Sequence, residues 1–191
     1  MDVQSLPPAE PIVGGDTRDD LAFLQKKATD QELKEGVRIP ICFGKLPEGS
    51  ILLEQLLSEY GPFPLPNAYA ARIVRDISFA LLFVHMQNIS HGAILAQSVI
   101  IARDGRALLL PPEHANRSAQ HDVRSLSLLL YRLTTGQDVP LGKKLPFLVN
   151  AELVKLAGYM METNMSAGQV HHNAELKKIA DEQTKTFLFH H

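Results

Sequence analysis

A helix-forming segment that is apolar on nearly every side, residues 122–136, most constrains what this chain can fold into. It begins with an aspartate, which favours the N-cap of a helix, and it ends with a glycine, which favours the C-cap. Leucine dominates between them, so the helix has no broad polar face, and such a helix is stable only when it is buried. The segment therefore predicts the central helix of a hydrophobic core, with Asp122 as its cap.

A second long helix is predicted over residues 67 to about 87. Its apolar residues recur at helical spacing, and Arg72, Arg75 and Asp76 lie on the opposite, solvent-facing side. Capping residues, glycines and prolines delimit four further helices. These are expected at residues 17–36, with an apolar face that runs from Leu21 to Leu33; at 50–61, capped by Ser50 and stopped by Gly61; at 150–162; and at 172–184.

Short β-strands are predicted between the helices. The apolar runs 99–102 and 107–110 flank an Asp-Gly turn, which is typical of a β-hairpin. Residues 37–43 alternate loosely and are rich in β-branched side chains, which predicts one more strand. The expected fold class is mainly α with a small β-hairpin.

Length and composition bound the class of protein. The chain has 191 residues, with 19 basic and 21 acidic side chains and a net charge of -2, and it has no basic block of the kind that follows a nucleic-acid backbone. Its one cysteine, Cys42, excludes an internal disulfide, and its apolar neighbours predict that it is buried. Without a targeting segment or a membrane-spanning apolar run, we expect a cytoplasmic or cytoskeletal protein that binds neither membrane nor nucleic acid.

The loop after the 67–87 helix carries the most informative motif. Residues 91–98 read His-Gly-Ala-Ile-Leu-Ala-Gln-Ser, and this frame resembles the catalytic loop of protein kinases. In that family an aspartate accepts the substrate proton, a lysine steadies the transferred phosphoryl group and an asparagine holds magnesium. The corresponding positions are Ala93, Leu95 and Ser98, and methyl or isobutyl groups can neither accept a proton nor neutralise phosphate. The resemblance implies a retained scaffold that is a pseudokinase.

The resemblance covers about residues 43–162. Residues 44–50 resemble the kinase hinge, and 122–136 resemble the Asp-Val-Trp-Ser-Leu-Gly helix, whose aspartate ties the backbone of the catalytic loop. A kinase large-lobe-like helical domain with a truncated or absent N-lobe is what this resemblance implies. The organisation that we expect is a Pro/Gly-rich tail (1–17), an N-lobe remnant of one helix and one strand (18–44), a C-lobe-like domain (45–185) and a C-terminal tail (186–191).

The nucleotide site of the kinase family is not retained. Where the metal-binding Asp-Phe-Gly is expected, the chain has Leu110, Pro111, Pro112 and Glu113. Either Pro111 has replaced the aspartate, or these residues resemble the family's Ala-Pro-Glu, with Glu113 in a structural role and the activation loop excised; we favour the excision. No glycine-rich loop and no Val-Ala-x-Lys strand is present. We therefore expect no ATP, no other cofactor and no metal.

Other catalytic constellations are also incomplete. His91 is expected to be structural, since in kinases this histidine packs on the loop and bonds its backbone. A metal site of His114, His121 and Asp122 is an alternative, but a helix cap and loop tie explain Asp122 better. No Gly-x-Ser-x-Gly elbow presents a serine nucleophile. We expect no catalytic residues.

The functional expectation is a binding module. The chain resembles kinase non-catalytic C-lobe domains, which lack the upper lobe and bind peptides of partner proteins. This resemblance implies a catalytically dead scaffold or adaptor, with the groove beside residues 50–60 and the vacated active-site edge as candidate surfaces. A structural subunit of a large intracellular or cytoskeletal assembly and a divergent nucleotide-binding enzyme are the alternatives.

Overall fold

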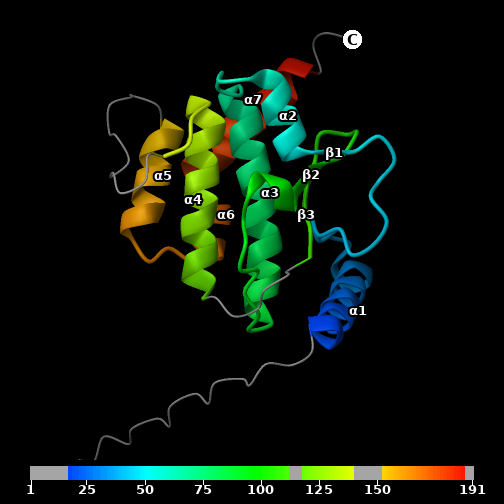
Figure 1. Cartoon of the computed structure of the whole chain (residues 1–191). Coiled ribbons are helices and arrows are strands. Elements are labelled where there is room, and N and C mark those ends of the chain that lie inside the picture. Colours follow the sequence, from blue (N-terminus) through cyan, green and yellow to red (C-terminus); the bar gives the residue numbers. More distant parts are fainter. Residues whose placement is uncertain (1–16, 112–117, 140–151, 188–191) are drawn as a thin grey trace, which may run out of the picture.

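The computed structural model describes residues 17–111, 118–139 and 152–187, and these form a mainly helical fold with a small antiparallel sheet (Figure 1). The mainly α class with a hairpin is confirmed. In chain order the elements are α1 (Thr17–Glu35), β1 (Ile51–Leu52), α2 (Leu53–Tyr60), α3 (Asn67–Met86), the short 3-10 helix η1 (Ala96–Ser98), β2 (Val99–Ile101), β3 (Ala107–Leu109), α4 (Ala119–Thr135), α5 (Glu152–Glu162), α6 (Ala167–His171) and α7 (Ala174–Phe187).

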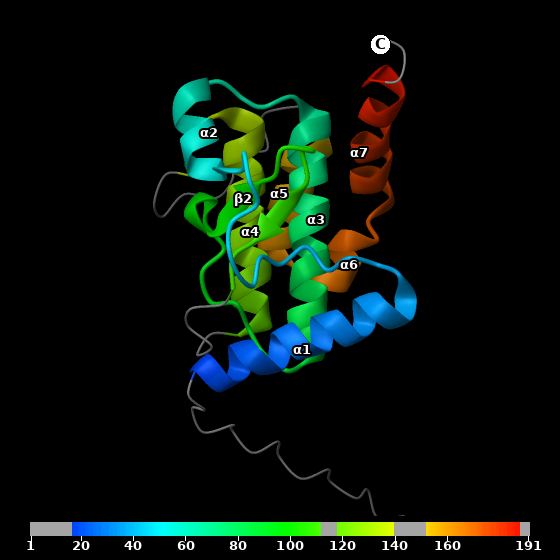
Figure 2. The same ribbon diagram turned by 90° about the vertical axis from the view of Figure 1, so that its right-hand side faces the viewer.

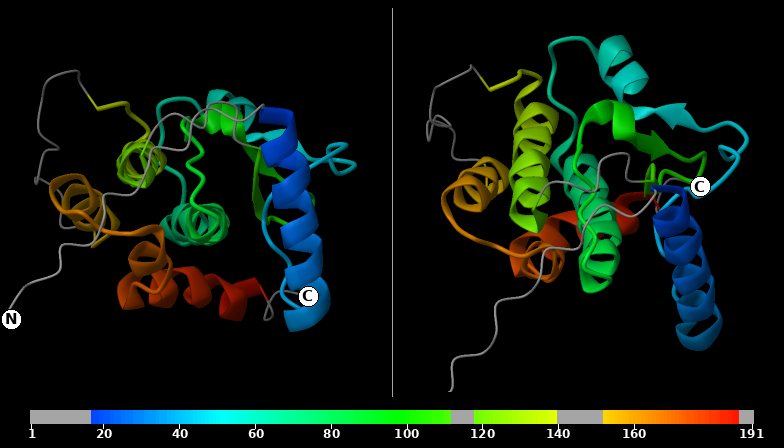
Figure 3. Two further views of the ribbon diagram at one scale, coloured as in Figure 1. Left: turned by 90° about the horizontal axis from the view of Figure 1, so that it is seen from below. Right: turned by 60° about the horizontal axis from the view of Figure 1, so that its bottom comes forward.

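Helices α3 and α4 form the centre of the core. Viewed along its axis, α3 lies between α4 and the sheet (Figure 3). Helix α5 packs against α4, and α6 and α7 pack against α3. Both central helices bury most of their apolar side chains, including Ile77, Leu81, Leu126 and Leu130, each with an exposed fraction of 0%. The predictions of two long helices that meet in the core are confirmed.

The sheet has the strand order β1-β2-β3 and is antiparallel throughout. The predicted hairpin is confirmed, with Ile100 opposite Leu108. Asp76 of α3 supports it, because its carboxylate accepts a hydrogen bond of 3.0 Å from the Ala107 backbone N–H. The prediction that Asp76 faces solvent is therefore wrong, and this half-buried carboxylate attaches the sheet to the core.

Residues 37–43 do not form the predicted strand. They contribute one isolated parallel bridge, between Ile41 and Leu109 of β3. The Leu109 N–H donates to the carbonyl of Pro40, and the Cys42 N–H donates to the carbonyl of Leu109. Pro40 has no N–H of its own, so the ladder is interrupted at this residue. Cys42 is buried as predicted, with an exposed fraction of 8%.

Helix α1 lies across one side of the molecule (Figure 2). It ends at Gly36, whose positive φ of 68° suits a helix terminus. Leu24 and Ala28 are buried and belong to the same hydrophobic cluster as α3 and α4. Leu33, however, is 81% exposed, so the expected apolar face does not extend to the end of the helix.

Two predicted helix starts differ from the structure. Ser50 is not a cap, because its hydroxyl donates to the carbonyl of Pro47 and β1 intervenes before α2. The predicted helix 172–184 is preceded by the separate short helix α6, whose N-cap is Ser166 in a capping box with Gln169. A hydroxyl followed three residues later by a glutamine is a known start signal. Among the described helices, none combines the length and hydropathy needed to cross a bilayer.

Candidate functional site

The loop that links α3 to β2 is held in place by a buried carboxylate from α4. Asp122 is 0% exposed, and its two oxygens accept hydrogen bonds of 2.7 Å and 2.8 Å from the backbone N–H groups of His91 and Gly92. The positive φ of Gly92, 85°, fits the turn that presents both donors. These contacts fix the start of the loop to α4.

Asp122 is not the N-cap of α4, which corrects the first expectation for this residue. Helix α4 begins at Ala119, and the hydroxyl of Ser118 caps it by accepting from the His121 N–H. Asp122 therefore lies within the first turn, where its side chain is directed at the loop instead of at its own helix.

His85 of α3 completes the support of this carboxylate. Its Nε2 lies 2.9 Å from the Asp122 Oδ2, and since a carboxylate only accepts, the histidine is the donor. Burial raises the pKa of Asp122, but the hydrogen bonds from His85, His91 and Gly92 outweigh this effect and lower the pKa below its usual range. The carboxylate is thus held ionised inside the protein.

Both ring nitrogens of His91 are engaged. Nδ1 accepts from the Ala93 backbone N–H at 3.3 Å, and Nε2 lies 2.8 Å from the carbonyl of Leu110. The ring therefore carries its proton on Nε2 and donates it to Leu110. His91 is 1% exposed. These contacts make it a structural link between the loop and the end of β3.

The loop positions singled out from the sequence come together around a small cavity. Of the residues named from the sequence, His91, Ala93, Leu95, Ser98 and Pro111 all line this cavity of about 120 Å³. The Ser98 hydroxyl donates to the Leu95 carbonyl and accepts from the Leu95 N–H, so it closes the turn at η1. Glu113, also named as a structural residue, lies outside the described residues. The cavity is lined mainly by apolar and neutral groups.

A second and larger cavity adjoins the same loop. Its volume is about 210 Å³, and Leu95 lines this cavity as well as the first one. The side chain of Leu95 is 56% exposed. We use the name Leu95 groove for the two cavities on either side of this residue. The larger cavity is lined by Ile94, Leu95, Ala96, Ser125, Leu128, Leu129, Arg132, Asp138 and Val139.

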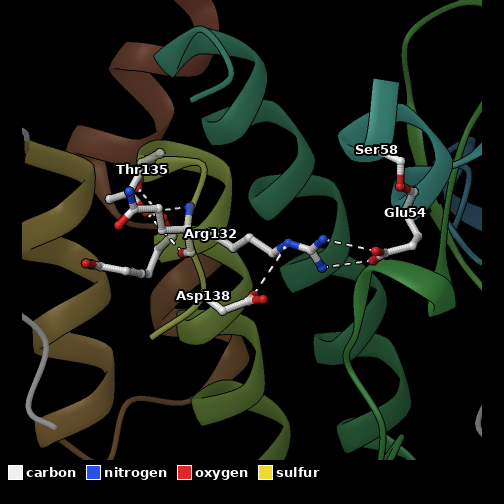
Figure 4. A network of polar contacts seen from close by, with 8 residues as sticks. Glu54, Ser58, Arg132, Thr135 and Asp138 are labelled. Carbon is white, nitrogen blue, oxygen red and sulfur yellow. Dashed lines mark hydrogen bonds and ion pairs between the residues drawn. The ribbon is translucent and has the colours of Figure 1, made fainter. Parts of the chain in front are cut away.

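A polar network that the sequence did not reveal borders this larger cavity. Arg132 of α4 reaches across to α2 and makes two hydrogen bonds with Glu54, of 2.8 Å and 3.0 Å (Figure 4). Its Nε also lies 3.5 Å from the Asp138 carboxylate. In the sequence, the arginine within the apolar second half of this helix was the signal that could have indicated a polar contact here. Glu54 falls within residues 50–60, where the sequence placed a candidate surface.

The alternative metal site is not assembled from the residues that can be placed. Asp122 is directed at His85 and the loop, whereas His121 Nδ1 lies 3.4 Å from the Ser125 hydroxyl of its own helix. His114 lies outside the described residues. Across residues 17–111, 118–139 and 152–187, no group of three His, Cys, Asp or Glu side chains could hold a metal ion.

No protein-family model matches the chain.

The Asp122 contacts predict a specific pH dependence of stability. Because the folded-state pKa of Asp122 is lowered, its contribution is complete above the unfolded pKa of about 4 and is lost as the pH falls through the folded value. We expect the free energy of unfolding of wild type to approach that of Asp122→Asn between pH 7 and pH 3, measured by urea denaturation. A constant difference across this range would contradict the assignment.

Proposed function

We propose that this chain is a catalytically inactive, protein-kinase-like domain that binds other proteins as a scaffold or adaptor. The order of the loop, the hairpin and the α4 helix supports this proposal, together with the tie between Asp122 and the loop backbone. Ala93, Leu95 and Ser98 occupy the positions where phosphoryl transfer requires a base, a cation and a metal ligand. Binding without chemistry is the function that these residues support best.

One observation carries the binding proposal, namely the exposure of Leu95 on an anchored loop. Asp122 holds the start of the loop, and the Ser98 hydroxyl closes its end. A large apolar side chain that is 56% exposed on such a support, between two cavities, presents a preformed contact. Preformed apolar contacts favour binding because little side-chain entropy is lost on association.

The test compares partner capture by wild type with capture by Leu95→Asp. We expect this variant to lose most of the captured protein, because a charge at a buried interface contact costs about 2 kcal/mol or more. Leu33→Asp is the matched control, since Leu33 is 81% exposed and lies on α1, away from the Leu95 groove. Companions would be quantified after affinity purification of each tagged protein from its own cells.

A second arm of the same experiment tests the nucleotide-binding alternative. We expect no change in the melting temperature of wild type on addition of ATP and magnesium, since a ligand stabilises a protein only if it binds the folded state. Equal capture by wild type and Leu95→Asp would contradict the proposed surface. A magnesium-dependent shift with ATP would favour an enzyme over an adaptor.

A further inference from the structure

The larger cavity of the Leu95 groove has the size of a side chain. Its volume of about 210 Å³ is below the range of about 300–1,000 Å³ in which proteins enclose drug-sized ligands. Leu95, Leu128, Leu129 and Val139 supply apolar walls, and Leu95 and Leu128 are 56% and 40% exposed. A cavity of this kind suits one aliphatic side chain of a peptide better than a free metabolite.

Among the described residues, the charges at its edge are unbalanced. The two terminal nitrogens of Arg132 are both committed to Glu54, at 2.8 Å and 3.0 Å (Figure 4). Within the described part of the chain, Asp138 has only a 3.5 Å contact with the remaining Nε, and its side chain is 80% exposed. Two carboxylates thus face one guanidinium, and Asp138 has the capacity to accept further hydrogen bonds. The complement of this edge is a cation.

Building on the proposed function, we propose that the Leu95 groove binds an extended segment of a partner protein that combines an aliphatic residue with a nearby lysine or arginine. The aliphatic side chain enters the larger cavity, and the basic side chain binds Asp138. Charge complementarity selects such a partner over acidic ones. The chain's own residues 1–16 do not have this chemistry, since they carry three carboxylates and no lysine or arginine, whereas residues 140–151 combine leucines with Lys143 and Lys144 and lie outside the described residues.

The probe is a set of labelled eight-residue peptides with one central leucine among serines and glycines. One lysine, or one glutamate, is moved through the neighbouring positions, and binding to the full chain is measured by fluorescence polarisation. We expect one lysine position to bind about tenfold more tightly than its glutamate counterpart, and salt to reduce this preference. Replacing the central leucine with alanine should weaken binding by about tenfold.

Two variants of the protein assign the effect to a residue. Asp138→Asn should weaken the affinity for the lysine peptide by about two- to fivefold, which is the range for exposed charge pairs. Asp181→Asn is the matched control, because Asp181 is also an exposed carboxylate paired with an arginine, at 2.9 Å from Arg75, but lies on α7. We expect it to leave the affinity unchanged. Lysine and glutamate peptides of equal affinity, or an unchanged affinity in Asp138→Asn, would overturn the proposal.

The outcomes separate this inference from the proposed function. If no peptide binds while partner capture still depends on Leu95, the inference fails and the proposed function stands. If, in addition, wild type and Leu95→Asp capture partners equally, both the inference and the proposed function fail. A dimer that Leu95→Asp converts to a monomer in analytical ultracentrifugation would assign the groove to a second copy of the chain and would likewise overturn the inference.

Discussion

Gly136→Ala is expected to lower the free energy of unfolding by about 3 kcal/mol or more. Gly136 ends α4 with a φ of 72°, a conformation that disfavours any side chain. A Cβ at this position would also overlap the Pro62 carbonyl oxygen and lie 2.6 Å from its carbon. This segment cannot move away easily, since the Leu65 N–H donates to the carbonyl of Leu133 at 2.8 Å. Urea denaturation followed by far-ultraviolet circular dichroism measures the change.

Gly36→Ala is the control for the backbone contribution alone. Gly36 ends α1 with a similar φ of 68°, but no atom of the described residues lies within 4 Å of the place that a Cβ would take, so only the conformational cost of about 1 kcal/mol applies. The difference between the two variants isolates the close approach of α4 to the α2–α3 connection. Equal losses in both variants would show that this contact is not tight.

Asp122→Asn is expected to cost about 3 kcal/mol at neutral pH. The carboxylate accepts hydrogen bonds from the His91 N–H, the Gly92 N–H and His85 Nε2, and Asp122 itself is 0% exposed. An asparagine has the same shape but one acceptor oxygen, and its NH2 group would face a buried donor. We expect an unchanged denaturant dependence with a lower midpoint, which indicates lost stability without a change in compactness.

An unchanged fold with a displaced loop is what this variant should produce. Hydrogen exchange of the amides of His91 and Gly92 should accelerate more than exchange in the centre of α3, because the substitution removes one of the two oxygens that accept from this pair. Asp181→Asn again serves as the control, since its exposed ion pair with Arg75 contributes little. A loss below about 1 kcal/mol in Asp122→Asn would contradict a supporting role for this carboxylate.

The sequence predicted the elements whose signals are local. Helix α3 and the β2–β3 hairpin follow from apolar spacing and an Asp-Gly turn, and both are present. Periodicity succeeds here because one face of each element packs on the core. The prediction of a strand over residues 37–43 was wrong, because Pro40 and the single partner residue Leu109 limit the pairing of this segment to one bridge.

Interactions between residues that are far apart in the sequence could not be predicted from local patterns. Arg132 and Glu54 are 78 positions apart, so no local pattern indicates that they pair. Asp76 looked like a solvent-facing residue of α3, although it accepts from the Ala107 N–H, 31 positions away. The loop positions, by contrast, were chosen by a resemblance to a known motif, and this resemblance stays a prediction. Their spatial proximity follows from short connections, whereas the charged edge of the groove depends on tertiary packing.

The tie between α4 and the loop also constrains the order of folding. His91 and Asp122 are 31 positions apart, so we expect the loop to acquire its final backbone only once the later helix has formed and packed. On a ribosome, α3 and the hairpin are synthesised before their carboxylate anchor. The loop around Leu95 is therefore expected to be completed late, only after α4 has emerged from the ribosome.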